Sequence, residues 1–327
     1  MNTQTMKRFL VLTLAMAMLL SANAGALFGR KKEAPQPQEG APIAQEISIT
    51  TYRDIPYQAQ FLATDGEGED MTYAVVDQPR KGTVVIDGAD FVYTPDAGVT
   101  GGDRFTYTAT DSSGNVSLPA TVMISIEKTR SGVTYADTGD SAAAAAAQHL
   151  AECGVFTGAK IGGQYYFEPE KTVSRSEFLA MVLETAQRKV TDVTVTGFCD
   201  DDVIPTWAKA YASAGVTDGI IRGTVTDEGV AFRGAESITF NEAATVLNRV
   251  LDLGDVDLSV WYADREAVPS WAAQAVGNME AVSVLSAGSF GSAAMEEAVT
   301  RADAAKMLSA ARVLLEGEEP GIFDWLG

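Results

Sequence analysis

The chain has 327 residues, enough for two or three domains with separate cores. Its formal net charge of −20 at pH 7 repels nucleic acid and anionic lipid at long range, which argues against both as partners. An anionic ligand would have to be held by a few local cations and backbone N–H groups. The sequence has no zinc-protease motif, paired Cys-x-x-Cys, phosphate loop or nucleophile elbow, and we therefore expect that the protein is not an enzyme.

The first 26 residues have the order of a secretory signal peptide. Lys7 and Arg8 form a basic region, residues 9–20 an apolar run, and small residues at 22–26 a cleavage site. The run is too short to span a bilayer, and no later segment reaches the roughly 20 apolar residues that a membrane helix needs. The sequence predicts an exported protein without a membrane span, followed at 27–44 by an extended, proline-containing linker.

Between residues 45 and 128 the apolar pattern has a period of two. Short runs rich in Val, Ile, Thr, Tyr and Phe are separated by turn residues such as Asp87-Gly88. Six or seven such strands in about 80 residues are typical of an immunoglobulin-like sandwich. The expected strands are 45–51, 71–76, 82–86, 91–94, 104–110 and 120–126.

Two phrases of this segment, at 91–98 and 102–107, resemble the cadherin-like and Ig-like repeats of bacterial surface proteins. The resemblance implies a domain that acts as a spacer or contacts a surface protein. The loop at 65–70 interleaves acids with glycine, which suits Ca²⁺, although an acidic hairpin turn explains it equally well. The candidate calcium ligands are Asp65, Glu67 and Glu69, with Asp103 or Asp111 as additional ones.

After about residue 133 the pattern becomes helical and repeats. Three aromatic-x-Asp openers begin at residues 135, 198 and 262, which are 63 and 64 residues apart. Each leads into an Ala-rich helix, expected at 142–152, 207–218 and 271–282. A second helix then begins at a capping signal, at 174–177, 239–242 and 300–303. The expected repeats are 133–192, 196–254 and 260–316, followed by a tail at 317–327 that either folds back or meets a partner.

These units resemble S-layer-homology domains, which combine an aromatic-x-Asp opener, a Trp on the first helix, Gly-Ile-x-x-Gly and Thr-Arg-Ala-Glu. The resemblance covers about 135–315 in three registered copies. It implies a pseudo-threefold, mainly α bundle whose inter-repeat grooves bind a secondary cell-wall polysaccharide, often one with a pyruvate ketal. It therefore implies a protein of the wall, S-layer or surface of a bacterium, bound to a peptidoglycan-linked polymer.

The resemblance also names candidate binding residues. An Arg beside a helix N-terminus offers a fork of donors to a carboxylate, a glycine turn lets backbone N–H groups approach a ligand, and a Trp offers a face to a sugar ring. Arg175 and Arg301 are the carboxylate candidates and Trp207 and Trp271 the aromatic wall. The glycine turns are Gly154, Gly158, Gly219 and Gly223.

Structural roles compete with these assignments. The two Trp residues could belong to the helix cores, and Gly154 and Gly219 could be ordinary helix C-caps. The repeats are also incomplete, because Phe240 replaces the motif Arg of the second, Ala142 the Trp of the first, and Ser283 and Ala287 the glycines of the third. We therefore expect at most one or two grooves to bind.

Two further residue types remain. Cys153 and Cys199 either form a disulfide or are two small buried side chains, and His149 on the first Ala-rich helix is expected to be structural or exposed.

The leading functional hypothesis is a wall-anchored structural or adhesion protein. The alternatives are an extracellular protein–protein assembly module with degenerate repeats, and an enzyme or accessory subunit whose site the sequence does not reveal.

Overall fold

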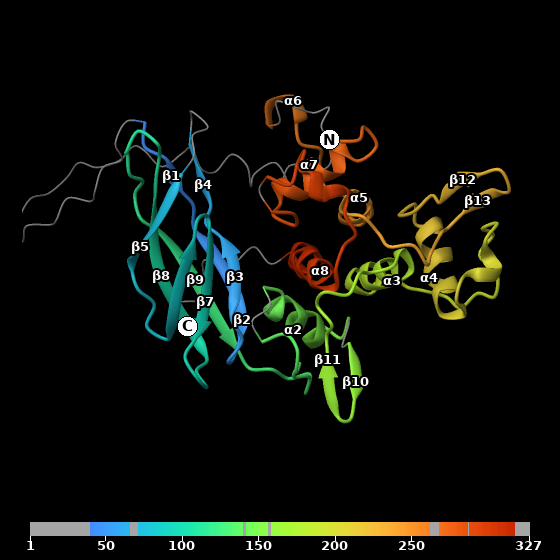
Figure 1. Cartoon of the computed structure of the whole chain (residues 1–327), viewed down its shortest axis with the longest axis horizontal. Helices are drawn as coiled ribbons and strands as arrows, with labels where there is room; N and C mark the ends of the chain where they lie inside the picture. The colour runs from blue at the N-terminus through green and yellow to red at the C-terminus, as the bar shows by residue number, and fades with distance from the viewer. Residues whose placement is uncertain are drawn as a thin grey trace, which may run out of the picture. The chain divides into compact units, whose positions relative to one another are not determined.

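A computed structural model describes residues 40–65, 71–139, 142–155, 158–261, 268–286 and 288–317. The expected signal peptide, most of the expected linker, Glu67 and Glu69, the third opener at 262–264, Ala287 and the tail after Gly317 lie outside the described residues. The described chain consists of a β-rich segment followed by a mixed, mainly helical one (Figure 1).

The β-rich segment is a sandwich of two sheets. The four-stranded sheet has the order β2-β9-β8-β5, in which β2 pairs with β9 in parallel and the other neighbours are antiparallel. The three-stranded sheet has the order β3-β7-β6, and β1 pairs with β4 in a short ribbon. The strands are β1 (Ile43–Ala44), β2 (Ile47–Tyr52), β3 (Tyr57–Gln60), β4 (Ala63–Thr64), β5 (Thr72–Asp77), β6 (Gly82–Asp87), β7 (Asp90–Pro95), β8 (Gly101–Thr110) and β9 (Ala120–Glu127).

The period-two pattern fills the space between the sheets, because alternate residues of β8 and β9 point inward and are buried. Phe61 lies at the centre of an aromatic cluster, with its ring centroid 4.7 Å from Phe91 and 4.5 Å from Tyr107. All six expected strands are present within two or three residues. Three strands were not expected: β1 takes the last two residues of the expected linker, β3 was missed because its sequence, YQAQ, has too few apolar residues, and β4 has only two residues.

Asp103, a candidate calcium ligand, has a structural role instead. Its carboxylate accepts the backbone N–H groups of Arg80 (3.0 Å) and Lys81 (2.9 Å) and the hydroxyl of Tyr93 (2.9 Å). Burial opposes ionisation of this carboxyl group, but the backbone donors outweigh it and hold its pKa below the usual range. Asp111 is similarly engaged, since it accepts the backbone N–H (2.8 Å) and the side-chain amide (2.9 Å) of Asn115.

The helical segment contains three units of similar plan. In the first two units a helix is followed by a small antiparallel hairpin and then by a second helix, whereas the third has a 3₁₀ turn in place of the hairpin. The first unit contains α2 (Ala144–Glu152), β10 (Ala159–Ile161), β11 (Gln164–Tyr166) and α3 (Arg175–Thr185). The second contains η2 (Asp201–Val203), α4 (Thr206–Thr217), β12 (Thr224–Thr226), β13 (Gly229–Ala231) and α5 (Phe240–Leu251), and the third α6 (Leu258–Trp261), α7 (Ala273–Ala281), η4 (Ala293–Glu296) and α8 (Arg301–Glu316).

A closed ring of backbone hydrogen bonds joins the segments that precede α3, α5 and α8. Val173 N–H donates to the carbonyl of Val299 (2.9 Å), Val299 to Ile238 (2.9 Å), and Ile238 to Val173 (3.0 Å). Each unit thus donates one backbone hydrogen bond and accepts one, which is the pattern of threefold internal symmetry. The helix pairs follow the same order, since α4 packs on α3, α7 on α5, and α2 on α8.

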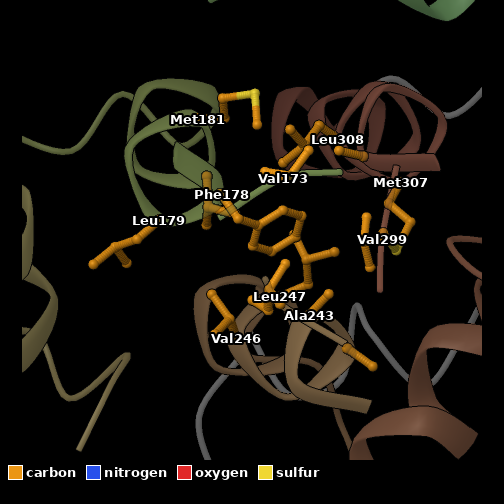
Figure 2. Packing of buried hydrophobic residues seen from close by; sticks show 14 of the residues in the cluster. Val173, Phe178, Leu179, Met181, Ala243, Val246, Leu247, Val299, Met307 and Leu308 are labelled. Carbon is orange, nitrogen blue, oxygen red and sulfur yellow. The ribbon is translucent and has the colours of Figure 1, made fainter. Parts of the chain in front are cut away.

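The centre of this arrangement is filled asymmetrically. Phe178 of α3 is fully buried, and its counterparts one turn after the equivalent caps are Ala243 of α5 and Ala304 of α8. Figure 2 shows the Phe178 ring between Val173 and Leu247, with Val299 and Leu308 beside them. One large and two small residues fill a space that three phenylalanines could not share.

Candidate functional site

The opener motifs fix the chain that leads into each second helix. Asp137 accepts the backbone N–H groups of Phe167 and Glu168, each at 2.8 Å. In the second unit Asp200 accepts those of Phe232 and Arg233, again at 2.8 Å. The opener aromatic packs on the same loop, with Tyr135 5.3 Å from Phe167 and Phe198 5.5 Å from Phe232 between ring centroids. The motif is therefore a clasp between the start of a unit and the end of its hairpin.

The first glycines of the two glycine turns are helix C-terminal residues. Gly154 (φ +73°) and Gly219 (φ +72°) take the left-handed conformation two residues after the ends of α2 and α4, and their Cβ positions would meet nothing. The equivalent Ser283 keeps this conformation with φ +58°. For Gly154 and Gly219 the C-cap interpretation is therefore sufficient.

The second glycines are required for close packing of the chain. A Cβ on Gly158 would lie 2.2 Å from the carbonyl oxygen of Tyr166, and one on Gly223 would lie 2.6 Å from Val230. Both residues also have positive φ. They allow the turn to cross its own hairpin, which brings the turn of the first unit to the edge of a cavity described below.

Each second helix begins at the expected capping box. The side chains of the N-cap residues accept a hydrogen bond from the backbone N–H of the third helical residue, and the acid at that third position accepts one from the backbone N–H of the N-cap. The N-caps are Ser174, Thr239 and Thr300. The first helical residue is Arg175 in the first unit, Phe240 in the second and Arg301 in the third. Both guanidinium groups therefore start from the N-terminus of a rigid helix.

A cavity of about 410 Å³ lies against α3 and α4 and is called the α3–α4 cavity here. Three of the predicted site residues line it, one from each unit: Gly158, Trp207 and Arg301. Its charged residues are three acids and two bases. The lining also includes Glu168, Lys171, Glu177, Glu184 and Tyr211.

The guanidinium group of Arg301 contacts other groups of the protein. Its Nη1 donates to Glu168 (2.6 Å), and its guanidinium lies 5.5 Å from the centroid of the Phe167 ring. Burial lowers the pKa of Arg301 from its ordinary value, and the charges of Glu168 and Glu177 oppose that shift. Arg remains charged at any physiological pH, so Arg301 is a permanent cation in this cavity, and its carboxylate partner, Glu168, is exposed.

The other end of the cavity is aromatic. The ring centroids of Trp207 and Tyr211 lie 6.5 Å apart on successive turns of α4, and the Tyr211 hydroxyl donates to Glu184 (2.8 Å). That bond raises the pKa of Tyr211. Trp207 is 51% exposed and Trp271 is 58% exposed, so the core interpretation of both was wrong. Exposed indole faces beside hydrogen-bonding acids suit stacking against a sugar ring.

The remaining predicted residues do not line this cavity. Arg175 donates to Glu242 (2.5 Å) and to the carbonyl of Phe232 (3.2 Å), and Trp271 lies on the turn that leads into α7. Sequence analysis missed Glu168, Lys171, Glu184 and Tyr211. Tyr211 follows Trp207 by one helical turn, a spacing that could have indicated a shared face. The acids carried no such signal because acidic residues are common throughout the chain.

The cysteines and the histidine take no part in the cavity. Cys153 and Cys199 are both free, the first partly buried and the second exposed, so neither the disulfide nor the fully buried pair is present. His149 Nδ1 lies 2.7 Å from the hydroxyl of Ser309, which agrees with a structural role. Within the described residues no group of three or more His, Cys, Asp or Glu side chains could hold a metal ion. The described helices also include none that is long and apolar enough to cross a membrane.

Comparison with protein families places residues 39–125 in the bacterial Ig domain family. This agrees with the Ig-like sandwich, and domains of this family are typical of extracellular proteins. The match covers the sandwich. A comparison with curated proteins gave no match.

Solved structures resemble the chain over less than a third of its length. The endo-fucoidan hydrolase MfFcnA4 of glycoside hydrolase family 107 is 21% identical with a TM-score of 0.24, over 29% of this chain and 15% of that one. The fibronectin(III)-like modules of Clostridium thermocellum CbhA are 16% identical (TM-score 0.20; 27% and 47%). A mutant of the SrpA adhesin from Streptococcus sanguinis is 18% identical (TM-score 0.21; 30% and 61%). The chain thus covers less than two thirds of each of these proteins.

Proposed function

We propose that the protein is a non-catalytic component of a bacterial cell envelope that holds an acidic wall polysaccharide through its three helical units, which act as S-layer-homology repeats. The Ig-like domain serves as a spacer or as an adhesion module. The observation that carries this proposal is the α3–α4 cavity, where Gly158, Trp207 and Arg301 come together from three different units. The motifs that bring them together are the ones that resemble the family.

The chemistry of the cavity supports a saccharide ligand. Trp207 and Tyr211 supply an apolar face and Glu184 accepts hydrogen bonds, as neutral sugar hydroxyls require. Arg301 supplies a cation from the N-terminus of α8, where the helix dipole adds to its field. A carboxylate on the ligand would replace Glu168 on Arg301, an exchange that is feasible because Glu168 is an exposed residue of a loop.

Co-sedimentation of the purified protein with cell-wall sacculi tests the proposal. We expect the protein to pellet with intact sacculi and to stay in solution after the secondary polysaccharide has been stripped chemically. Trp207→Ala is expected to weaken pelleting by about 10-fold, the usual loss of a stacked aromatic contact. Val203→Ala, which removes another exposed apolar side chain just before α4, is the matched control.

An alternative is an assembly module whose repeats no longer bind polysaccharide and pack on another protein. The exposed side chains of Ile161 and Val225, near the tips of the two hairpins, favour it because apolar tips are suited to protein contacts. Under this alternative, wild-type protein would not pellet with intact sacculi. Ile161→Ser with Val225→Ser would instead disrupt a defined protein complex.

A further inference from the structure

The α3–α4 cavity is apolar along much of its lining. Trp207 and Tyr211 lie on successive turns of α4, and half of the Trp207 surface is exposed (51%). Apolar side chains gathered around a hollow in this way suit contact with another apolar segment. Besides these two aromatic residues, the lining includes Val155, Ala159, Val173, Ala180 and Met181.

A short apolar run follows α8 in the sequence. Residues 322–326 read Ile-Phe-Asp-Trp-Leu, so four of these five side chains are apolar or aromatic. Pro320 and Gly321 come directly before the run and do not favour continuation of the helix. Removal of this apolar area from water would be favourable. The sequence alone leaves open where the run binds.

The end of α8 lies beside the end of α3, next to the cavity. Arg312 Nη1 donates to the carbonyl of Thr185 (2.9 Å), and its Nε donates to Glu316 (2.5 Å), the last residue of α8. Thr185 directly follows Glu184, which lines the cavity. Gly317 then takes the left-handed conformation (φ +67°), which turns the chain away from the direction of the helix.

The residue that follows α2 links the same helix end to another part of the lining. Burial raises the pKa of the Cys153 thiol, the charge of Arg312 opposes this shift, and the charge of Glu316 adds to it. Cys153 is therefore close to the last turn of α8. Val155, two residues later, lines the cavity. Chain segments on both sides of the end of α8 thus lead into the cavity.

The spacer between α8 and the apolar run is long enough to reach the cavity. The five residue steps from Gly317 to Ile322 span up to about 17 Å when extended. Along α3 the lining extends from Glu177 to Glu184, which is about 10 Å at the helical rise. A run tethered this closely has a high effective concentration at the cavity, so it outcompetes the same run of another copy.

We infer that residues 322–326 bind in the α3–α4 cavity of their own chain, with Phe323 and Trp325 against Trp207 and Tyr211. The run covers the exposed half of Trp207 and removes its own apolar side chains from water. Glu184, which accepts the Tyr211 hydroxyl, can also accept the indole N–H of Trp325, since a carboxylate has several acceptor sites.

This inference goes beyond the proposed function because it makes the cavity a self-occupied site. A wall polymer that binds there has to displace residues 322–326 first. The apparent affinity for any ligand of the cavity is then lowered by the fraction of molecules in which the run is bound.

Fluorine NMR of the whole protein labelled with 5-fluorotryptophan tests the inference. Trp207→Phe and Trp271→Phe assign the two signals that matter. Phe323→Ser with Trp325→Ser, called the tail variant, should move the Trp207 signal and increase its isotope shift between H₂O and D₂O, because the indole loses its cover. Trp271 is 58% exposed and does not line the cavity, so its signal should stay in place as the internal control.

A matched variant changes the spacer and keeps the apolar run. Glu318→Ser with Glu319→Ser replaces two residues of the same tail and should leave the Trp207 signal where it is in wild type. A synthetic peptide of residues 321–327 supplies the second measurement. Calorimetric titration should show that it binds the tail variant at least about 10-fold more tightly than wild type, in which the tethered run already occupies the cavity.

The inference is overturned if the Trp207 signal is the same in wild type and in the tail variant, or if the peptide binds both proteins equally or neither. A Trp207 signal that moves with protein concentration would also overturn it, because the run would then bind in the cavity of another copy. No saccharide is used in these measurements. Sacculus binding therefore tests the proposed function separately, and either conclusion can fail without the other.

Discussion

The first and second helical units share a backbone and differ in charge, whereas the third keeps its capped helix and loses its hairpin. The bonds that recur in the first two are the Asp clasp, the capping box and the ring through Val173 and Ile238. Glu168 and its counterpart Arg233 are exposed, whereas Phe178 and its counterpart Ala243 are buried. The backbone bonds are the same in both units, while side chains differ both on the surface and at the axis.

In the described part of the third unit, a carboxylate on α7 holds the loop that follows this helix. No hairpin follows α7 in the described part of this unit, and the loop is held instead by Glu280, which accepts the N–H groups of Gly288 (3.0 Å) and Phe290 (2.7 Å). This acid belongs to the helix α7. The common requirement is a carboxylate that accepts backbone N–H groups of the loop, whichever residue supplies it.

The largest effect is expected at the axis, where the units differ in size. Phe178→Ala should lower the free energy of unfolding of the helical segment by about 3–5 kcal/mol, because the empty space left by the ring would lie among residues of all three second helices. Adding Ala243→Phe to that variant should restore part of the loss, since it moves the large residue to an equivalent position. Urea unfolding followed by Trp fluorescence reports this segment, because all four Trp lie after residue 200.

Ala243→Phe alone is the control for that exchange. It should destabilise the segment by about 1–3 kcal/mol through overpacking. If the double variant is no more stable than Phe178→Ala, the three axial positions are not equivalent.

The sandwich contains the same device as the repeats, since Asp103 accepts two successive backbone N–H groups. Its pKa is held below that of an unfolded chain, about 3.9, so its contribution is complete above that pH and is lost as pH falls through the lower folded value. We expect Asp103→Ala to lower the free energy of unfolding of the sandwich by about 2–3 kcal/mol at pH 7. Below about pH 4, the unfolding free energy of this variant should depend less on pH than that of the wild type. Near-UV circular dichroism of the Tyr residues measures the loss, and Asp87→Ala, exposed at the end of β6, is the control.

The clasp of the second unit should matter somewhat less because Asp200 is partly exposed. Asp200→Ala leaves two N–H groups without their acceptor and should cost about 2 kcal/mol. Asp202→Ala, on the same 3₁₀ turn but exposed, should change stability by less than about 0.5 kcal/mol. Equal effects of the two substitutions in urea unfolding would refute the role of the opener motif as a clasp.

The smallest effect concerns the helix ends. Ser283→Gly should raise stability by about 1 kcal/mol, because it removes the cost of a left-handed side-chain-bearing residue. Gly219→Ser, the same exchange in the opposite direction at the equivalent position, should lower it by a similar amount. Matching shifts of opposite sign in the thermal midpoint would confirm the equivalence of these two ends, and shifts of the same sign would contradict it.

Local signals were sufficient for much of this fold. The capping boxes at Ser174, Thr239 and Thr300, the Ala-rich helices and six strands follow from periodicity and short-range hydrogen bonding. The two hairpins were missed because their strands are only three residues long and polar in part. Strands so short carry too little pattern to stand out from a loop.

The candidate site was predictable in composition but not in arrangement. The motifs indicated Arg301, Trp207 and Gly158 individually, while the ring of backbone bonds that brings three units together depends on residues far apart in the chain. Glu168, the partner of Arg301, had no motif of its own, and Glu242, the partner of Arg175, was predicted only as the acid of a capping box. Which residues pair across units is decided by packing, and periodicity within a unit does not contain that information.

The most direct test compares binding of the purified wall polysaccharide before and after its carboxylates are reduced to alcohols. Calorimetric titration of the whole protein with both polymers measures the loss. We expect the native polymer to bind and the reduced polymer to bind at least about 10-fold more weakly, since reduction removes the charged partner of the arginines. Equal affinity for the two polymers, or binding to neither, would contradict the account.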